Sequence, residues 1–279
     1  MKATYKLFAI AASLVMLSSL SQAALLTNEF ITAGGNFTNE ANWSQGTVPV
    51  IGTDVGVLNS ITATNTSTRP FDNKQLILNG TSLLTAPSAP LTGTNFNIVL
   101  NNTGKLYASN GGSMSYGTLV LNDSSMIHFG RDQAFTNCTI TLNGTSTGQV
   151  NRTTKLLNQS VVNLNDSSVF IANSSANATY IPVVDSTSYF NFNSTGTVLK
   201  VTLTSDFSAD FNQWIVDGRI LANGNTASTN NFNVTYTSGV GTSVQLIPEP
   251  ATAGLFGLAG AMVFLLRRQM KKKQTDEID

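Results

Sequence analysis

The stretch Leu119-Val120-Leu121-Asn122-Asp123-Ser124-Ser125 decides the fold, because close copies of it recur along the chain. Each copy is a short run of mainly apolar, alternating residues that ends in Asn and a polar turn. The other copies are Leu76-Ile77-Leu78-Asn79-Gly80-Thr81-Ser82, Ile98-Val99-Leu100-Asn101-Asn102-Thr103-Gly104, Ile140-Thr141-Leu142-Asn143-Gly144-Thr145-Ser146 and Val162-Asn163-Leu164-Asn165-Asp166-Ser167-Ser168. The alternation predicts β-strands, and the small polar residues predict the turns that follow them.

An Asn that directly follows a Leu recurs every 20 to 22 residues, in these copies and at Leu58-Asn59 before them. These residues are Asn59, Asn79, Asn101, Asn122, Asn143 and Asn165, and a further copy follows at Phe192-Asn193. A repeat of this length fits either a leucine-rich repeat or one coil of a β-helix. In the leucine-rich repeat the Asn lies three positions beyond the nearest strand Leu and a helical face accompanies it, whereas here the Asn follows the Leu directly and no helical face is evident.

We therefore predict an all-β fold, a right-handed parallel β-helix of about nine coils with two or three short strands per coil. Stacked coils lie about 4.8 Å apart, so the six Asn side chains should form a hydrogen-bonded ladder along one corner. The repeats predict a β-helix domain over residues 57–246. Residues 24–56 precede it, and the turn-rich segment around Trp43 is expected to cap the open end of the core; a sugar-stacking role for Trp43 is the alternative.

The last coils follow a weaker pattern. We expect strands at Val198–Leu203 and Trp214–Val216, and a loop that projects from one coil at Asn173–Thr179.

The N-terminus has the pattern of a cleaved secretory signal peptide over residues 1–23. A basic start is followed by an apolar run and by Ser21-Gln22-Ala23, whose small residues suit cleavage after Ala23 by signal peptidase. The pattern predicts export.

The C-terminus has three parts in sequence. Pro248-Glu249-Pro250 comes first, and an uncharged run over 251–266 predicts a short transmembrane helix. A basic cluster then predicts that the end stays in the cytoplasm. Its members are Arg267, Arg268, Lys271, Lys272 and Lys273.

This tail, residues 247–279, resembles a PEP-CTERM sorting signal. It departs from the usual pattern at Ile247, where Val is common, and in the acidic trailer after the basic cluster. The resemblance implies an exosortase as partner, with Pro248, Glu249 and Pro250 as the processing motif. It also implies transient anchoring in the inner membrane of a Gram-negative-type bacterium, followed by transfer to the cell surface or to an exopolysaccharide matrix. A plain membrane anchor with an accidental Pro-Glu-Pro is the alternative.

Composition narrows the functional classes. Residues 24–250 hold eight Lys and Arg against twelve Asp and Glu, a net charge of about −4, which disfavours nucleic acid as a partner.

Cys138 is the single cysteine, so no internal disulfide is expected. It alternates with Ile140 and Leu142, which indicates a buried apolar role. His128 is the single histidine. We expect no metal site, no cofactor and no catalytic residues.

A polysaccharide-cleaving enzyme on the same scaffold is the first alternative, because it needs only carboxylates on neighbouring coils. Asp123 and Asp166 occupy equivalent turns two coils apart, which is about 9.6 Å and within the range of an inverting pair. Both lie in Asn-Asp-Ser-Ser turns, however, where Asp is expected for turn chemistry, and this reading is favoured. A second acidic group and three basic residues complete the candidates, namely Asp206, Asp210, Asp217, Arg131, Arg152 and Lys155.

The second alternative is a glycan- or ice-binding surface, which requires a flat and regular array of Thr. Thr62-Ala63-Thr64-Asn65-Thr66 and Thr139-Ile140-Thr141 suggest one, although Thr is also common in exposed strands. The sequence as a whole favours an exported, non-enzymatic structural or adhesive protein of the cell surface or extracellular matrix.

Overall fold

The alternating segments form a parallel β-solenoid in the computed structural model of the chain, which describes residues 26–67, 70–151, 155–172 and 182–248. Contacts divide the chain into two compact units, Met1–Leu246 and Ile247–Asp279, and the first contains all the described strands. The described part is all-β with little helix, as the repeat predicts.

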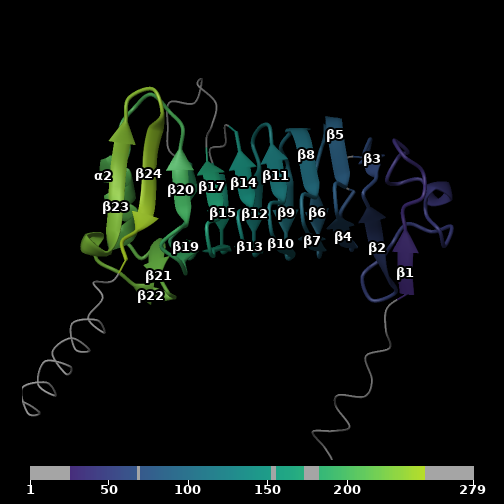
Figure 1. Ribbon diagram of the computed structural model, residues 1–279, viewed down its shortest axis with the longest axis horizontal. Coiled ribbons are helices and arrows are strands. Elements are labelled where there is room, and N and C mark those ends of the chain that lie inside the picture. Colours follow the sequence, from purple (N-terminus) through teal and green to yellow (C-terminus); the bar gives the residue numbers. More distant parts are fainter. Residues whose placement is uncertain (1–25, 68–69, 152–154, 173–181, 249–279) are drawn as a thin grey trace, which may run out of the picture. The chain divides into compact units, whose positions relative to one another are not determined.

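Three sheets make up the solenoid (Figure 1). The ten-stranded sheet has the order β1 (Leu26–Glu29), β2 (Asp54–Asn59), β4 (Gln75–Asn79), β7 (Asn97–Leu100), β10 (Thr118–Leu121), β13 (Thr139–Leu142), β16 (Val161–Leu164), β19 (Tyr189–Phe192), β21 (Ile220–Ala222), β22 (Asn225–Thr226). The nine-stranded sheet has the order β23 (Phe232–Thr237), β24 (Gly241–Leu246), β20 (Val198–Val201), β17 (Val169–Ala172), β14 (Thr147–Val150), β11 (Met126–Phe129), β8 (Lys105–Asn110), β5 (Leu83–Pro90), β3 (Thr62–Thr64). The five-stranded sheet has the order β18 (Val183–Val184), β15 (Lys155–Asn158), β12 (Ala134–Thr136), β9 (Ser113–Ser115), β6 (Gly93–Thr94).

About five turns of the solenoid are complete, since five times in succession the chain places one strand in each sheet, from β4-β5-β6 to β16-β17-β18. The expected nine coils are not confirmed as complete turns. At both ends of the solenoid, each turn of the chain contributes strands to fewer than three sheets.

The core follows directly from the alternation in the repeat. In the ten-stranded sheet Leu78, Leu100, Leu121, Leu142 and Leu164 lie in register on successive strands, and all are fully buried. Complete burial of one such side chain contributes about 1.5–3 kcal/mol. The Leu before each Asn is therefore the position that binds one coil to the next through the core.

The turn after each of these strands requires a residue with positive φ. The residue after the ladder Asn supplies it: Asn102 (φ 58°), Asp123 (φ 59°) and Asp166 (φ 57°), with Gly80 and Gly144 in the other coils. The ladder Asn itself continues the strand and presents its side chain along the axis. Gly, Asn and Asp are the residues that tolerate this left-handed conformation.

A column of small residues lies three positions after the ladder Asn, immediately before the next strand. Ser82, Ser125, Ser146 and Ser168 are all fully buried there. The Ser82 hydroxyl donates to the Leu58 carbonyl (2.7 Å) or the Asn79 carbonyl (2.6 Å). Among the described residues, the hydroxyls of the other three have no hydrogen-bond partner.

This difference predicts opposite outcomes for two matched substitutions. Ser82→Ala should lower the free energy of unfolding by about 1 kcal/mol, because a paired buried hydroxyl is lost. Ser146→Ala should leave it unchanged or raise it, because the removed hydroxyl is unpaired. Urea unfolding of both variants, followed by circular dichroism, measures the difference. Equal losses in the two variants would contradict it.

The N-terminal end of the solenoid is covered by aromatic residues. Trp43 is 2% exposed, and its ring lies edge-on to Phe30 (5.2 Å between centroids) and Phe37 (5.3 Å). Its indole N–H donates to the Phe37 carbonyl at 2.8 Å. The buried ring cannot be a platform for a sugar, so packing at the end of the core is its role. A single 3-10 turn, η1 (Glu40–Asn42), precedes it.

The structure of the C-terminal end of the solenoid differs from one expectation. Trp214–Val216 was predicted to be a strand, but it forms the end of the helix α2 (Ser208–Val216). Phe211, Trp214 and Ile215 recur at helical spacing and are buried, so they cover the last coil with one apolar face. The 3-10 turn η2 (Thr229–Asn231) leads into β23, which pairs antiparallel with β24, and β24 pairs antiparallel with β20.

Several predicted segments lie outside the described residues. They are the signal peptide with Ala23, the loop Asn173–Thr179, Glu249 and Pro250, the run 251–266, and the basic residues that follow it. Within the part of the chain that is described, no helix is long and apolar enough to cross a membrane.

Candidate functional site

The predicted Asn residues lie together at one corner of the solenoid, and their side chains bond head to tail. Each Nδ2 donates to the Oδ1 of the Asn one coil earlier, at distances between 2.7 and 3.0 Å, from Asn79 onto Asn59 up to Asn165 onto Asn143. The row extends beyond the prediction in both directions. Asn193 donates to Asn165 at 2.8 Å, and Asn59 donates to the Glu29 carboxylate at 3.4 Å.

The carboxylates of the turns are bonded to backbone amides of neighbouring coils. Asp123 accepts from the Asn102 N–H and Asp166 accepts from the Gly144 N–H, both at 2.8 Å. Each carboxylate thus connects its own coil to the one before it, and this use explains why Asp recurs at the position.

The second acidic group is also engaged locally, except for the exposed Asp210 on α2. Asp206 accepts from the Ser208 N–H at 2.8 Å, and these hydrogen bonds from Ser208 hold the pKa of its carboxyl below the ordinary value. Asp217 pairs with Arg219 at 3.3 Å. No group of three or more His, Cys, Asp or Glu that could hold a metal ion occurs among the described residues.

Cys138 has the environment of a structural residue. Its Sγ lies 3.3 Å from the carbonyls of Met114 and Thr136, and the residue is 3% exposed. Burial raises the pKa of the thiol, which is the opposite of the shift that activates a nucleophile.

His128 lies on the outer face of the nine-stranded sheet, away from Cys138, which precedes β13 in the ten-stranded sheet. Its ring packs edge-on against Tyr107 (4.9 Å between centroids), and its Nε2 lies 3.0 Å from Asn151 Nδ2. Burial lowers the pKa of the imidazole, so its neutral form is favoured at neutral pH. The neutral ring can then accept the Asn151 N–H.

The two Thr segments do not form one array. Thr62 and Thr64 lie on β3 in the nine-stranded sheet, whereas Thr139 and Thr141 lie on β13 in the ten-stranded sheet. The neighbours of Thr141 in register are Val120 and Asn163. The regular Thr surface that ice binding requires is therefore missing from these described strands.

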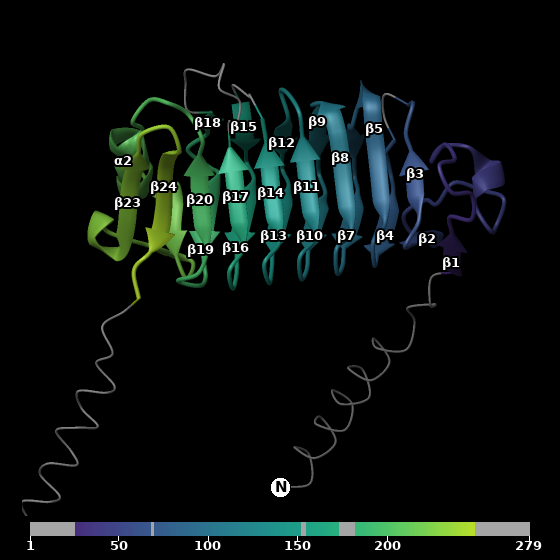
Figure 2. The same cartoon turned by 45° about the horizontal axis from the view of Figure 1, so that its top comes forward.

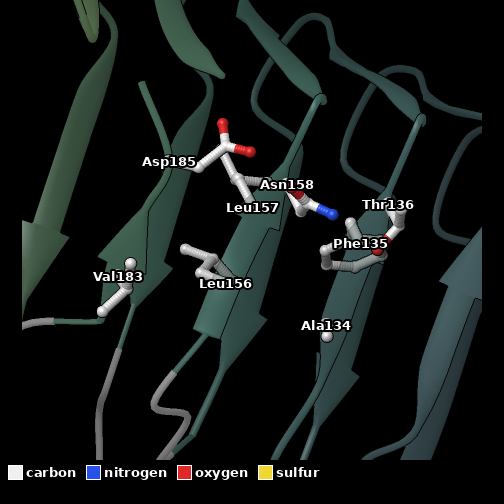
Figure 3. A pocket seen from close by; sticks show the side chains of 8 residues that line it. All are labelled: Ala134, Phe135, Thr136, Leu156, Leu157, Asn158, Val183 and Asp185. Carbon is white, nitrogen blue, oxygen red and sulfur yellow. The ribbon is translucent and has the colours of Figure 1, made fainter. Parts of the chain in front are cut away.

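Two hollows lie along the five-stranded sheet. The larger, of about 300 Å³, is lined by side chains from β12, β15 and β18 and by Asp185 (Figure 3). The smaller, of about 190 Å³, is lined by Asp72 and by residues of β6 and β9. One outward row connects them: Thr94, Ser115, Thr136 and Asn158 are in register on successive strands.

A carboxylate lies at each end of this row. Asp72 accepts from the Thr94 N–H at 2.9 Å, and Asp185 accepts from the Gln159 N–H at 3.0 Å. Although partial burial acts to raise the pKa of Asp185, hydrogen bonds from Ser188, Gln159 and Thr187 outweigh it and the pKa is lowered. Both carboxylates therefore act as hydrogen-bond acceptors for backbone N–H groups at the two ends of the row.

The two carboxylates are too far apart to act as a pair. Five strand spacings of about 4.8 Å separate Asp72 from Asp185, or about 24 Å, whereas glycosidase carboxylates lie roughly 5 to 10 Å apart. Arg131, which we considered as a cationic neighbour, is exposed, whereas Arg152 and the side chain of Lys155 lie outside the described residues. The hollows thus combine hydroxyl and apolar surface without two converging acids.

Sequence reasoning missed one arrangement. It treated His128 as an isolated residue, but Tyr107, His128 and Gln149 are in register on β8, β11 and β14. A signal was present, because each of them follows a ladder Asn by six residues.

No family model matches the chain, and neither a curated protein nor a solved structure is found to be similar to it.

Proposed function

We propose that the chain is an exported, non-enzymatic structural or adhesive protein of the cell surface or extracellular matrix. In this proposal residues 1–23 direct export, 251–266 hold the protein in the inner membrane, and an exosortase processes the chain near Pro248-Glu249-Pro250. The solenoid is taken as right-handed, the hand of nearly all parallel crossovers. It has nine coils if each of the nine parallel strands of the ten-stranded sheet, β1 to β21, counts as one.

One observation carries the structural role: the polar side chains of the solenoid are used to join coil to coil. The Asn row bonds along one corner, and Asp123 and Asp166 accept backbone N–H groups of the preceding coil. A carboxylate held in this way has a fixed acceptor role, whereas a general acid or base needs a carboxylate directed at a substrate. This use of side chains favours a rigid scaffold over an enzyme.

The sorting part of the proposal predicts that the C-terminal tail is removed and that removal depends on Pro248-Glu249-Pro250. In its native cells the mature protein should lack residues 251–279 and should be found at the surface or in the matrix. Replacing Pro248, Glu249 and Pro250 together by Ala should leave the tail in place and the protein in the membrane fraction. Intact-mass measurement of the C-terminus, combined with cell fractionation, gives both readouts.

A matched control changes two charges outside the motif. Asp276→Asn combined with Glu277→Gln removes acidic residues of the trailer and should be processed like the unchanged protein. If the unchanged protein retains residues 251–279, exosortase processing is wrong and the tail is a plain membrane anchor.

A further inference from the structure

The outer face of the nine-stranded sheet presents one continuous row of side chains across successive coils. Figure 2 shows the strands of this sheet side by side, from β5 to β20. We call the row the Tyr107 row. Its members, in register from strand to strand, are Thr85, Tyr107, His128, Gln149, Ile171 and Lys200.

Contacts between neighbouring side chains order the centre of the row. Tyr107 is 38% exposed, and its ring makes a T-shaped contact with the His128 ring at 4.9 Å between centroids. Asn151 then connects His128 (3.0 Å) to Gln149, whose Nε2 donates to the Asn151 Oδ1 at 2.9 Å. Because these side chains are already fixed, a ligand that contacts them incurs a smaller entropic cost on binding.

The charge of this face differs from that of the chain. Residues 24–250 carry about −4, yet the strands of the nine-stranded sheet, all of which the structure describes, contain no Asp or Glu. They contain Lys105 and Lys200 instead, and Lys105 lies two residues before Tyr107, on the same face and exposed. The sheet therefore offers a mildly cationic surface on an acidic protein, which is complementary to an anionic ligand.

The spacing of the row fits a linear polymer of sugars. Successive members lie about 4.8 Å apart, which is close to the length of one pyranose unit in an extended chain. An exposed Tyr ring suits the apolar face of a pyranose, and amide side chains such as Gln149 can both donate and accept hydrogen bonds with hydroxyls. A flat, repeated surface of this kind matches a polymer better than it matches a small molecule, which needs a pocket.

We propose that the Tyr107 row binds an acidic polysaccharide, lying across the strands, with Tyr107 stacked on a sugar ring and Lys105 beside a carboxylate of the polymer. This proposal rests on the proposed surface or matrix function and gives it a ligand class. Its test is separate from the sorting test, because binding can be measured whether or not the tail is cleaved.

Affinity electrophoresis of the protein isolated from its native cells tests the proposal. Polygalacturonate in the gel should retard the protein, and neutral dextran should not. Tyr107→Ala should weaken the retardation about tenfold or more, while Tyr107→Phe, which keeps the ring, should retain most of it. Lys105→Gln should weaken binding and reduce its dependence on salt.

Tyr116→Ala is the matched control. Tyr116 is a more exposed tyrosine (62%) that lies between β9 and β10, outside the nine-stranded sheet, so its loss should not change binding. Circular dichroism of each variant establishes that the fold is kept. The proposal is overturned if Tyr107→Ala binds polygalacturonate as tightly as the unchanged protein does, or if dextran retards the protein equally.

Discussion

Replacing Gly111 by alanine should lower the free energy of unfolding by about 3 kcal/mol, at the upper end of the cost of overpacking a well-packed interior. A Cβ at this position would lie 1.3 Å from the carbonyl oxygen of Arg131 and 2.4 Å from its carbonyl carbon. Both atoms belong to the backbone of the next coil, so no side-chain rotation relieves the overlap. The two coils must move apart locally, which strains the hydrogen bonds between β8 and β11.

A second glycine separates this effect from a general effect of alanine. Gly224 has φ +76° and open space around the position of a Cβ. Gly224→Ala should therefore cost only the strain of a left-handed alanine, about 1 kcal/mol. Urea unfolding of both variants gives the comparison, and equal stability of the two would show that the coils are not as closely stacked at Gly111 as described.

Removing one amide from the middle of the Asn row should also have a large effect. Asn122 donates to Asn101 and accepts from Asn143, each at 2.8 Å, so Asn122→Ala breaks two hydrogen bonds. At about 1 kcal/mol each, the expected loss of stability is about 2 kcal/mol. Asn59→Ala, at the exposed end of the row, should cost less than half as much, since its bond to Asn79 is 3.0 Å and its bond to Glu29 is 3.4 Å.

Asn122→Asp tests the direction of the bonds. An ionised carboxylate can accept from Asn143 but cannot donate to Asn101, so two acceptors would meet. The variant should be less stable than Asn122→Ala at neutral pH and should recover as the pH falls below about 4, where the acid gains a proton to donate. Thermal unfolding between neutral and acidic pH measures this. A variant whose stability relative to the unchanged protein does not depend on pH would rule out the bonded row.

The sequence predicted the solenoid because its core is periodic. An inward Leu and an outward Asn recur at nearly constant spacing, from Leu78-Asn79 to Leu164-Asn165, and this spacing determines which residues share a face. The structure of the C-terminal end of the solenoid was not predicted correctly, because the sequence there is not periodic. Trp214 and Ile215 are as apolar as strand residues, and only their spacing from Phe211 distinguishes a helix.

The candidate site was predictable only in part, and for a related reason. Tyr107, His128 and Gln149 differ in chemistry, so no repeated letter marks them, although their positions repeat with the period of the Asn row. Which hydroxyls of the Ser column find a partner, and which carboxylates accept a backbone N–H, depends on distances of a few tenths of an ångström. Such distances are set by packing and leave no pattern in the sequence.

The Asn row also has an electrical direction. In each amide of the row the N–H that bonds to the next Asn points toward the first coil, so the amide dipoles add along the solenoid as peptide dipoles add along a helix. The Glu29 carboxylate lies beside the positive end of this array, where a negative charge is stabilising. Reversing a single amide would bring two donors together on one side and two acceptors on the other. The orientation of each amide in the row therefore fixes the orientation of its neighbours.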